Sequence, residues 1–225
     1  MADPNEIPNL LVFDLELARS ISGRRGFAEA WKAGVSVLCA WGLRDPAPYV
    51  WILDATRFPR VFLSEDHATN IFERYDGVVS WNGVSFDDGV LAKAHSKIRK
   101  AYSRKRHVDL HATCCLLQAG VDADRIAEGL PKGWAKMVPT MRENLLNAGW
   151  SLDAVGTASV GMSKTEGPKG AEAAHAWQRG QYSEVISYCL GDVGLTRALW
   201  FKAWMDGYLE SSERGRVQIP RECLL

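Results

Sequence analysis

The order of the apolar runs constrains the fold of this chain more than any other feature. Three strand-like runs come first: LLVFDLEL (10–17), AGVSVLCAWGL (33–43) and YVWILDA (49–55). The turn-like stretch RDPAP separates the second run from the third. Helix-like and strand-like stretches then alternate, and this succession is typical of a layered α/β domain. With 225 residues, the chain is long enough to bury one sizeable core.

The rest of the chain supplies two more strands and the helices that would flank the sheet. The strands are expected at GVVSW (77–81) and RHVDL (106–110). The expected helices are 65–75 after Ser64, 86–102, 111–120, two short ones at 140–149 and 151–161, and a long last one at 182–209. We therefore predict a mixed five-stranded sheet in a single domain over 10–209, with tails at 1–9 and 210–225.

Composition limits the kinds of partner and the cellular compartment that we expect for the protein. Formal net charge is zero, so contact with a polyanion must come from local patches. The five cysteines contain no CxxC pair, which favours reduced thiols in a reducing compartment. We find no secretory signal pattern and no apolar run near the roughly 20 residues that span a bilayer. We therefore expect a soluble, cytoplasmic protein with no membrane partner.

Two carboxylates interrupt the first apolar run. Asp14 and Glu16 point the same way from a strand, because successive side chains alternate between its faces. Like charges this close repel each other unless a cation lies between them, and hard divalent cations such as Mg²⁺ and Mn²⁺ prefer oxygen ligands. A solvated strand end or an arginine partner would also explain the pair.

Two later stretches add carboxylates in a recurring context. WNGVSFDDGVL (81–91) places Asp87 and Asp88 at an expected helix start, where acids also favour the helix dipole. YSEVISYCLGD (182–192) places Tyr188 and Asp192 four residues apart, on one face of a helix. Each stretch by itself has a purely structural explanation.

As an ordered set, FDLE, NGVSFD and YCLGD resemble the motifs of the DEDD superfamily of 3′→5′ exonucleases. The tyrosine before the last aspartate is similar to the branch that has tyrosine there, including the proofreading domains of family B DNA polymerases and their stand-alone relatives. The resemblance covers about residues 10–205. It implies a ribonuclease-H-like fold and a site with two divalent metal ions, Mg²⁺ or Mn²⁺.

The resemblance also implies a role for each residue. Asp14 would bridge the two metals, Glu16 and Asp192 would complete one metal site, and Asp87 would serve the other. Asp87 is preferred to Asp88 because it directly follows Phe86. Tyr188 would position the attacking water, because a phenol with a pKa near 10 is a poor base at neutral pH. Many relatives have threonine after the first glutamate, where this chain has Leu17.

Further residues are expected to touch the substrate. The stretch 96–107 holds six basic residues, and phosphate contact and a solvated helix end explain it equally well. HVDLH (107–111) is a weak candidate for a transition-metal site. The expected substrate contacts are Leu17, Asn82, Phe86, Arg104, Lys105, Lys164 and Lys169.

These features together predict a metal-dependent 3′→5′ exonuclease that releases nucleoside 5′-monophosphates from single-stranded DNA. A polymerase or another replication or repair protein is the expected partner in trans. An exoribonuclease with the same chemistry is the first alternative, because nothing in the sequence reads a 2′-hydroxyl. A non-catalytic nucleic-acid-binding module and a structural-metal protein are weaker alternatives, since all four carboxylates are present and the cysteine spacing is unsuitable.

Overall fold

The computed structural model describes residues 7–21, 29–58, 61–129, 149–168 and 170–225. Five strands form one sheet in the order β3-β2-β1-β4-β5. They are β1 (Leu10–Leu17), β2 (Val35–Gly42), β3 (Tyr49–Ile52), β4 (Gly77–Ser80) and β5 (Arg106–Asp109). The pairs β1–β2 and β2–β3 are antiparallel, whereas β1–β4 and β4–β5 are parallel. The predicted mixed five-stranded sheet is confirmed.

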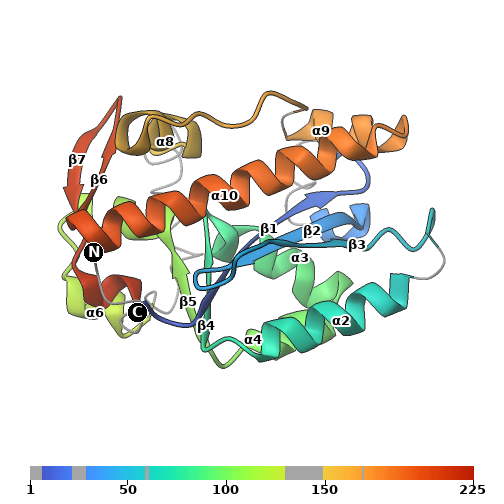
Figure 1. Ribbon diagram of the computed structural model, residues 1–225, viewed down its shortest axis with the longest axis horizontal. Helices are drawn as coiled ribbons and strands as arrows, with labels where there is room; N and C mark the ends of the chain where they lie inside the picture. The colour runs from blue at the N-terminus through green and yellow to red at the C-terminus, as the bar shows by residue number, and fades with distance from the viewer. Residues whose placement is uncertain (1–6, 22–28, 59–60, 130–148, 169) are drawn as a thin grey trace.

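Helices cover both faces of this sheet, as Figure 1 shows. One face carries α2 (Val61–Glu73), α3 (Asp87–Ala94) and α4 (Ser96–Tyr102). The long helix α10 (Tyr182–Asp206) crosses the other face. The remaining helices of the described chain are α5 (Leu110–Gln118), α6 (Ala123–Ala127), α8 (Leu152–Val160) and α9 (Ala171–Gln178), with short 3₁₀ turns at Ala30–Ala33, Gly83–Ser85 and Arg221–Leu224.

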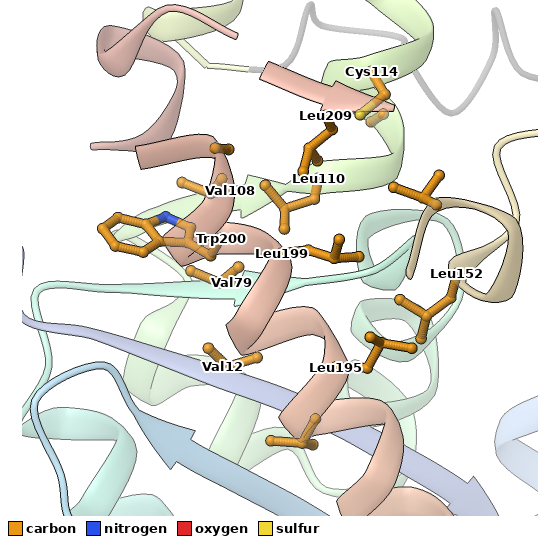
Figure 2. Packing of buried hydrophobic residues seen from close by; sticks show 14 of the residues in the cluster. Val12, Val79, Val108, Leu110, Cys114, Leu152, Leu195, Leu199, Trp200 and Leu209 are labelled. Carbon is orange, nitrogen blue, oxygen red and sulfur yellow. The ribbon is translucent and has the colours of Figure 1, made fainter. Parts of the chain in front are cut away.

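The two faces of β1 bury different residues. Val12 packs with Val79 and Val108 against the α10 residues Leu199 and Trp200 (Figure 2). Neighbouring residues of β1 face the opposite layer, where the rings of Phe13 and Phe72 lie 5.6 Å apart, centroid to centroid. Because side chains alternate along a strand, Asp14 and Glu16 belong to the face that α10 covers.

Several elements differ from their expected bounds. The expected helix at 86–102 is two helices, because His95 adopts φ −137° and ψ 63° between them. Helix α2 begins at Val61, ahead of the expected start after Ser64, and α10 ends at Asp206. Helix α9 lies where no helix was predicted. The helix expected at 140–149 falls outside the described residues except for Gly149.

The segment expected as a C-terminal tail packs against the domain. Strands β6 (Tyr208–Ser211) and β7 (Gly215–Gln218) form a hairpin, and a 3₁₀ turn follows. Val217, Ile219, Cys223 and Leu224 are buried in the same core as α10. All five cysteines are buried and unpaired, as the sequence predicts. None of the helices in the described ranges combines the length and the apolar composition that a bilayer crossing requires.

Candidate active site

The predicted acidic residues come from separate parts of the chain and meet at one edge of the sheet. Strands β1, β4 and β5 run parallel, so their carboxyl ends share an edge. Asp14 and Glu16 end β1, and Asp87 opens α3 after the turn that follows β4. Asp192 lies on α10, which packs across β1.

Mutual electrostatic effects show that these carboxyl groups are neighbours. Burial, followed by the charge of Asp192, raises the pKa of Asp14 to about 7. Burial and the charges of Asp14 and Asp192 raise the pKa of Glu16 well above its usual value. Burial and the charge of Asp14 do the same for Asp87. The pKa of Asp192 is also raised, chiefly by burial. A cluster of this kind favours protons or a bound cation.

The adjacent acids Asp87 and Asp88 have different surroundings. Asp87 is 4% exposed and faces the carboxylate cluster. Asp88 instead accepts hydrogen bonds from Tyr102 and Arg99, at 2.8 and 3.1 Å. Burial would raise the pKa of Asp88, but His107 and Arg99 outweigh it and lower that pKa. The predicted preference for Asp87 over Asp88 is consistent with this geometry.

Lys164 is the cation nearest to the cluster in the described chain. Its Nζ lies 2.5 Å from Oδ2 of Asp192 and 4.8 Å from the centroid of the Tyr188 ring. Burial would lower the pKa of Lys164, but Asp192 outweighs it and raises that pKa. The loop places Lys164 by its backbone, because the Lys164 N–H donates to Asp153 at 2.8 Å. Burial also raises the pKa of Tyr188 to about 12, so its phenol keeps its proton at neutral pH.

The loop 162–168 lies directly on the turn of α10 that carries Tyr188 and Asp192. A Cβ built on Gly191 would be 1.9 Å from Oγ1 of Thr165, so the loop approaches the helix more closely than any side chain at 191 permits. A Cβ on Gly167 would lie 3.6 Å from the Tyr188 side chain. The loop and the helix therefore share one contact surface, with the ammonium of Lys164 at its centre.

The donor chemistry of the cluster suits a hard divalent cation. Four carboxyl groups supply only oxygen ligands. Oδ1 of Asp192 is buried and makes no hydrogen bond, so it is available as a ligand. Over the described ranges, however, no three His, Cys, Asp or Glu side chains are arranged to hold a metal ion. The carboxylates of the described chain thus lie near one another, but no three of them are arranged around a common metal position. Lys164 supplies the local positive charge.

A cavity of about 440 Å³ opens beside Glu16. Its apolar lining comes from Leu15, Leu17, Ile21, Phe86 and Ala174, and its polar lining comes from Glu16, Arg19, Ser20 and Asn82. Among the non-glycine residues described, Asn82 alone has a positive φ, of 65°. Three of the expected substrate contacts, Leu17, Asn82 and Phe86, are therefore brought together next to the carboxylates.

Two other expected substrate contacts lie elsewhere. Arg104 and Lys105 precede β5, so they lie at the opposite edge of the sheet from the carboxylates. The Nζ of Lys105 donates to the carbonyl oxygens of Phe72, Glu73 and Tyr75 at the end of α2. A cavity of about 480 Å³ lined by Arg104 and Lys105 runs along β5 and includes none of the four carboxylates. Lys169 lies outside the described residues.

The three side chains of the weak metal candidate HVDLH have separate partners, so they do not form one site. Nε2 of His107 lies 2.7 Å from Oγ of Ser80, whereas the ring of His111 contacts Trp81 at 5.9 Å between centroids. The carboxylate of Asp109 accepts hydrogen bonds from three backbone N–H groups, one of them at the start of α5. An aspartate just before a helical pattern is a capping signal, and that signal was available in the sequence.

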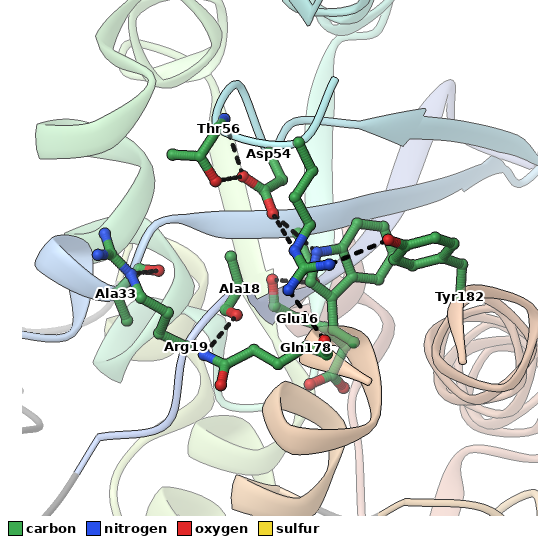
Figure 3. A network of polar contacts seen from close by, with 11 residues as sticks. Glu16, Ala18, Arg19, Ala33, Asp54, Thr56, Gln178 and Tyr182 are labelled. Atoms are coloured by element: carbon green, nitrogen blue, oxygen red, sulfur yellow. Dashed lines mark hydrogen bonds and ion pairs between the residues drawn. The ribbon is translucent and has the colours of Figure 1, made fainter. Parts of the chain in front are cut away.

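A polar network that the sequence did not indicate anchors the start of α10 (Figure 3). Buried Asp54 accepts hydrogen bonds from Thr56 and from the indole of Trp177, the latter at 2.8 Å. Arg57 donates to the hydroxyl of Tyr182 and to the carbonyl of Gln178. These contacts fasten α9 and α10 to the end of β3, and so fix the helix that carries Tyr188 and Asp192.

Comparison with known proteins finds a relative in structure only. No protein-family model matches the chain, and no curated protein matches it. Among solved structures, it is similar to the family B DNA polymerase from the hyperthermophilic archaeon Pyrobaculum calidifontis, with a TM-score of 0.54 and 17% sequence identity. The match covers 88% of this chain and 25% of the polymerase chain. The chain thus spans about a quarter of that polymerase and shares with it an α/β fold, consistent with a ribonuclease-H-like domain.

Proposed function

We propose that the protein is a metal-dependent 3′→5′ exonuclease that acts on single-stranded DNA and releases nucleoside 5′-monophosphates. One observation carries the proposal: Asp14, Glu16 and Asp87 lie at one edge of the sheet, and Asp192 and Tyr188 lie on the helix that packs across β1. The structural likeness to a DNA polymerase supports a function related to nucleic acid. A 3′ end delivered by a polymerase or repair protein in trans is part of the same proposal.

The four carboxylates would hold two divalent ions, Mg²⁺ or Mn²⁺. When bound, such ions stabilise charge on the attacking and leaving oxygens of a phosphodiester. Tyr188 keeps its proton and serves as a hydrogen-bonding group that orients water, because its pKa of about 12 makes it a poor base. Lys164 balances the charge of Asp192 and would contact a phosphate of the substrate.

The proposal assigns the terminal nucleoside to the cavity of about 440 Å³ beside Glu16. Its walls are mostly apolar, so they can pack against the face of any base without reading its edges. Asn82 adds one amide that can hydrogen-bond to the sugar or the base. A single strand can place its end in such a cavity without the cost of unpairing a duplex.

A labelled-substrate assay tests the proposal. The protein is incubated with 5′-labelled single-stranded DNA or RNA of equal sequence, with Mg²⁺, Mn²⁺ or chelator, in parallel with Asp14→Asn and Asp124→Asn. We expect stepwise shortening from the 3′ end that requires metal and is lost in Asp14→Asn. Asp124→Asn is the matched variant and should retain the chemistry, since Asp124 is exposed on α6, outside the cluster.

The outcomes separate the alternatives. Faster cleavage of RNA than of DNA would assign the exoribonuclease alternative. Binding of both strands without shortening under every metal condition would leave only a non-catalytic module. Equal loss of cleavage in both variants would contradict the proposed role of Asp14 as a metal ligand.

A further inference from the structure

Three consecutive backbone N–H groups after β4 are held by side chains. The N–H groups of Asn82 and Val84 donate to the two carboxylate oxygens of Asp109, at 3.0 and 3.1 Å. The N–H between them, from Gly83, donates to Oγ of Ser80 at 3.1 Å. Ser80 and Asp109 are paired at the last position of the parallel strands β4 and β5. The turn is thus fixed by two side chains at the strand ends.

The hydroxyl of Ser80 also contacts the imidazole ring of His107. His107 lies between Ser80 and Asp88, with Nε2 at 2.7 Å from the hydroxyl and Nδ1 at 3.3 Å from the carboxylate, a contact that does not have the geometry of a hydrogen bond. In the tautomer with the proton on Nδ1, Nε2 accepts the Ser80 proton, and the Ser80 oxygen then accepts from the N–H of Gly83. Ser80, His107 and Asp88 have the order of a hydrolase triad, but Ser80 is 0% exposed, so it has no access to a substrate.

The turn has a reason to need this support. Asn82 holds the left-handed conformation at φ 65°, which costs free energy for a residue with a side chain. A Cβ at Gly83 would lie 2.5 Å from Oγ of Ser80, so the chain passes close to the serine. Asn82 and Phe86, at the two ends of this turn, line the cavity beside Glu16.

We propose that Ser80 and Asp109 are positioning residues for substrate binding, and that His107 and Asp88 orient the Ser80 hydroxyl. They act through Asn82, which they keep in its left-handed conformation with its amide in the cavity. The inference rests on the proposed exonuclease function, because the turn then holds the terminal nucleotide. Removal of either acceptor lets the strained turn relax and moves the amide out of the cavity.

A double-mutant cycle tests the inference. Ser80→Ala, Asp109→Asn, Asn82→Gly and the pair Ser80→Ala/Asn82→Gly are compared for KM and kcat on a short single-stranded oligonucleotide. Affinity for deoxyadenosine 5′-monophosphate with Mg²⁺ is measured by calorimetry as a readout without turnover. We expect each single variant to raise KM and weaken monophosphate binding by roughly ten-fold or more, the range for groups that orient ligands. The change in kcat should be smaller.

The cycle distinguishes positioning from general support. If Ser80 acts through Asn82, Ser80→Ala should add nothing further in the Asn82→Gly background. Glycine adopts the left-handed conformation without cost, so Asn82→Gly should fold normally. Matched controls are Asp122→Ala and Ser159→Ala, which remove acceptors of backbone N–H groups at 2.8 Å in other parts of the fold and should leave KM unchanged.

Each result has a defined meaning. Additive effects of Ser80→Ala and Asn82→Gly, or unchanged KM in folded Ser80→Ala and Asp109→Asn, would overturn the inference while leaving the exonuclease intact. An inactive wild-type protein that also fails to bind the monophosphate would overturn the proposed function and the inference together. If Ser80→Ala unfolds, the isosteric Asp109→Asn carries the same cycle with Asn82→Gly.

Discussion

Burial and a neighbouring negative charge together raise the pKa of the Asp14 carboxyl group. Its pKa rises from 3.8 to about 7 because burial and Asp192 both disfavour the charged form. The folded protein therefore holds this proton to a higher pH than the unfolded chain does. The stabilising contribution is complete below pH about 4 and is lost as the pH rises through about 7.

We therefore predict that the metal-free protein loses stability between pH 5 and 8, and that Asp14→Asn reduces this loss. In chelator at pH 8, Asp14→Asn should raise the free energy of unfolding by about 1–3 kcal/mol, because a neutral amide removes a buried charge. Urea unfolding of both proteins across this pH range measures the effect. The exposed carboxylate Asp124 offers a control, and Asp124→Asn should follow the wild type.

Mn²⁺ provides the complementary measurement. Added ion should stabilise the wild type most at pH 8, where the carboxylates are ionised, and should stabilise Asp14→Asn much less. A wild type whose stability rises with pH in chelator would contradict the cause given for the Asp14 pKa.

The contact between α10 and the loop 162–168 depends on a glycine. Alanine at Gly191 would bring its Cβ to 1.9 Å from Oγ1 and 2.9 Å from Cβ of Thr165, so the loop must move away from the helix. Lys164 would then lose its position on Asp192. We predict that Gly191→Ala reduces the proposed exonuclease activity at least about ten-fold, the usual loss when an orienting contact is removed.

Gly194 provides a matched control on the same helix. No atom outside the helix backbone lies within 4 Å of a Cβ built there. Gly194→Ala should therefore keep full activity and stabilise the protein by about 0.5–1 kcal/mol, because alanine favours the helix. Parallel activity and thermal-unfolding measurements compare the two variants. Similar activity in both would show that the loop contact has no part in the reaction.

Local patterns predicted the strands well, but tertiary contacts decided several helix bounds. Strands β1 to β4 are mainly apolar runs bounded by turn residues, so their positions follow from sequence, whereas β5 (RHVD) contains a single aliphatic residue. The break at His95 has no proline or glycine to mark it. Its cause lies in packing: α4 packs on α2, and Nδ1 of His95 lies 3.6 Å from a carboxylate oxygen of Glu65. The pattern of residues within 86–102 cannot indicate that contact, because Glu65 lies outside this stretch.

The site residues divide in the same way. Asp14, Glu16, Asp87, Tyr188 and Asp192 were named from motifs, and the fold brings them to one region. The positions of Ser80 and Asp109 depend on strand pairing between β4 and β5, which the sequence alone does not state. Composition could not reveal that Lys105 serves a helix end, because the carbonyls it binds lie in a different part of the chain.

Charge across the whole molecule is balanced, and most of the basic cluster at 97–106 has partners within the protein. Lys97 and Arg99 pair with Asp66 and Asp88, at 2.9 and 3.1 Å. Lys105 donates to three carbonyl groups, and Arg106 donates to the carbonyl of Glu222. The cluster therefore mainly ties α2, α4 and the C-terminal turn to the domain, at the sheet edge away from the carboxylates.

This arrangement predicts that Lys105 supports stability and that neither Lys105 nor Arg104 supports substrate binding. Lys105→Ala should lower the free energy of unfolding by about 1–2 kcal/mol, because the carbonyl oxygens at the end of α2 lose a charged donor. Its KM for single-stranded DNA should stay at the wild-type value. The exposed neighbour Arg104 is the matched control, and Arg104→Ala should change neither quantity. Each phosphate contact steepens the salt dependence of binding, so KM is measured at several salt concentrations. A shallower salt dependence in either variant would place the nucleic acid along β5 and contradict its placement at the carboxylate edge.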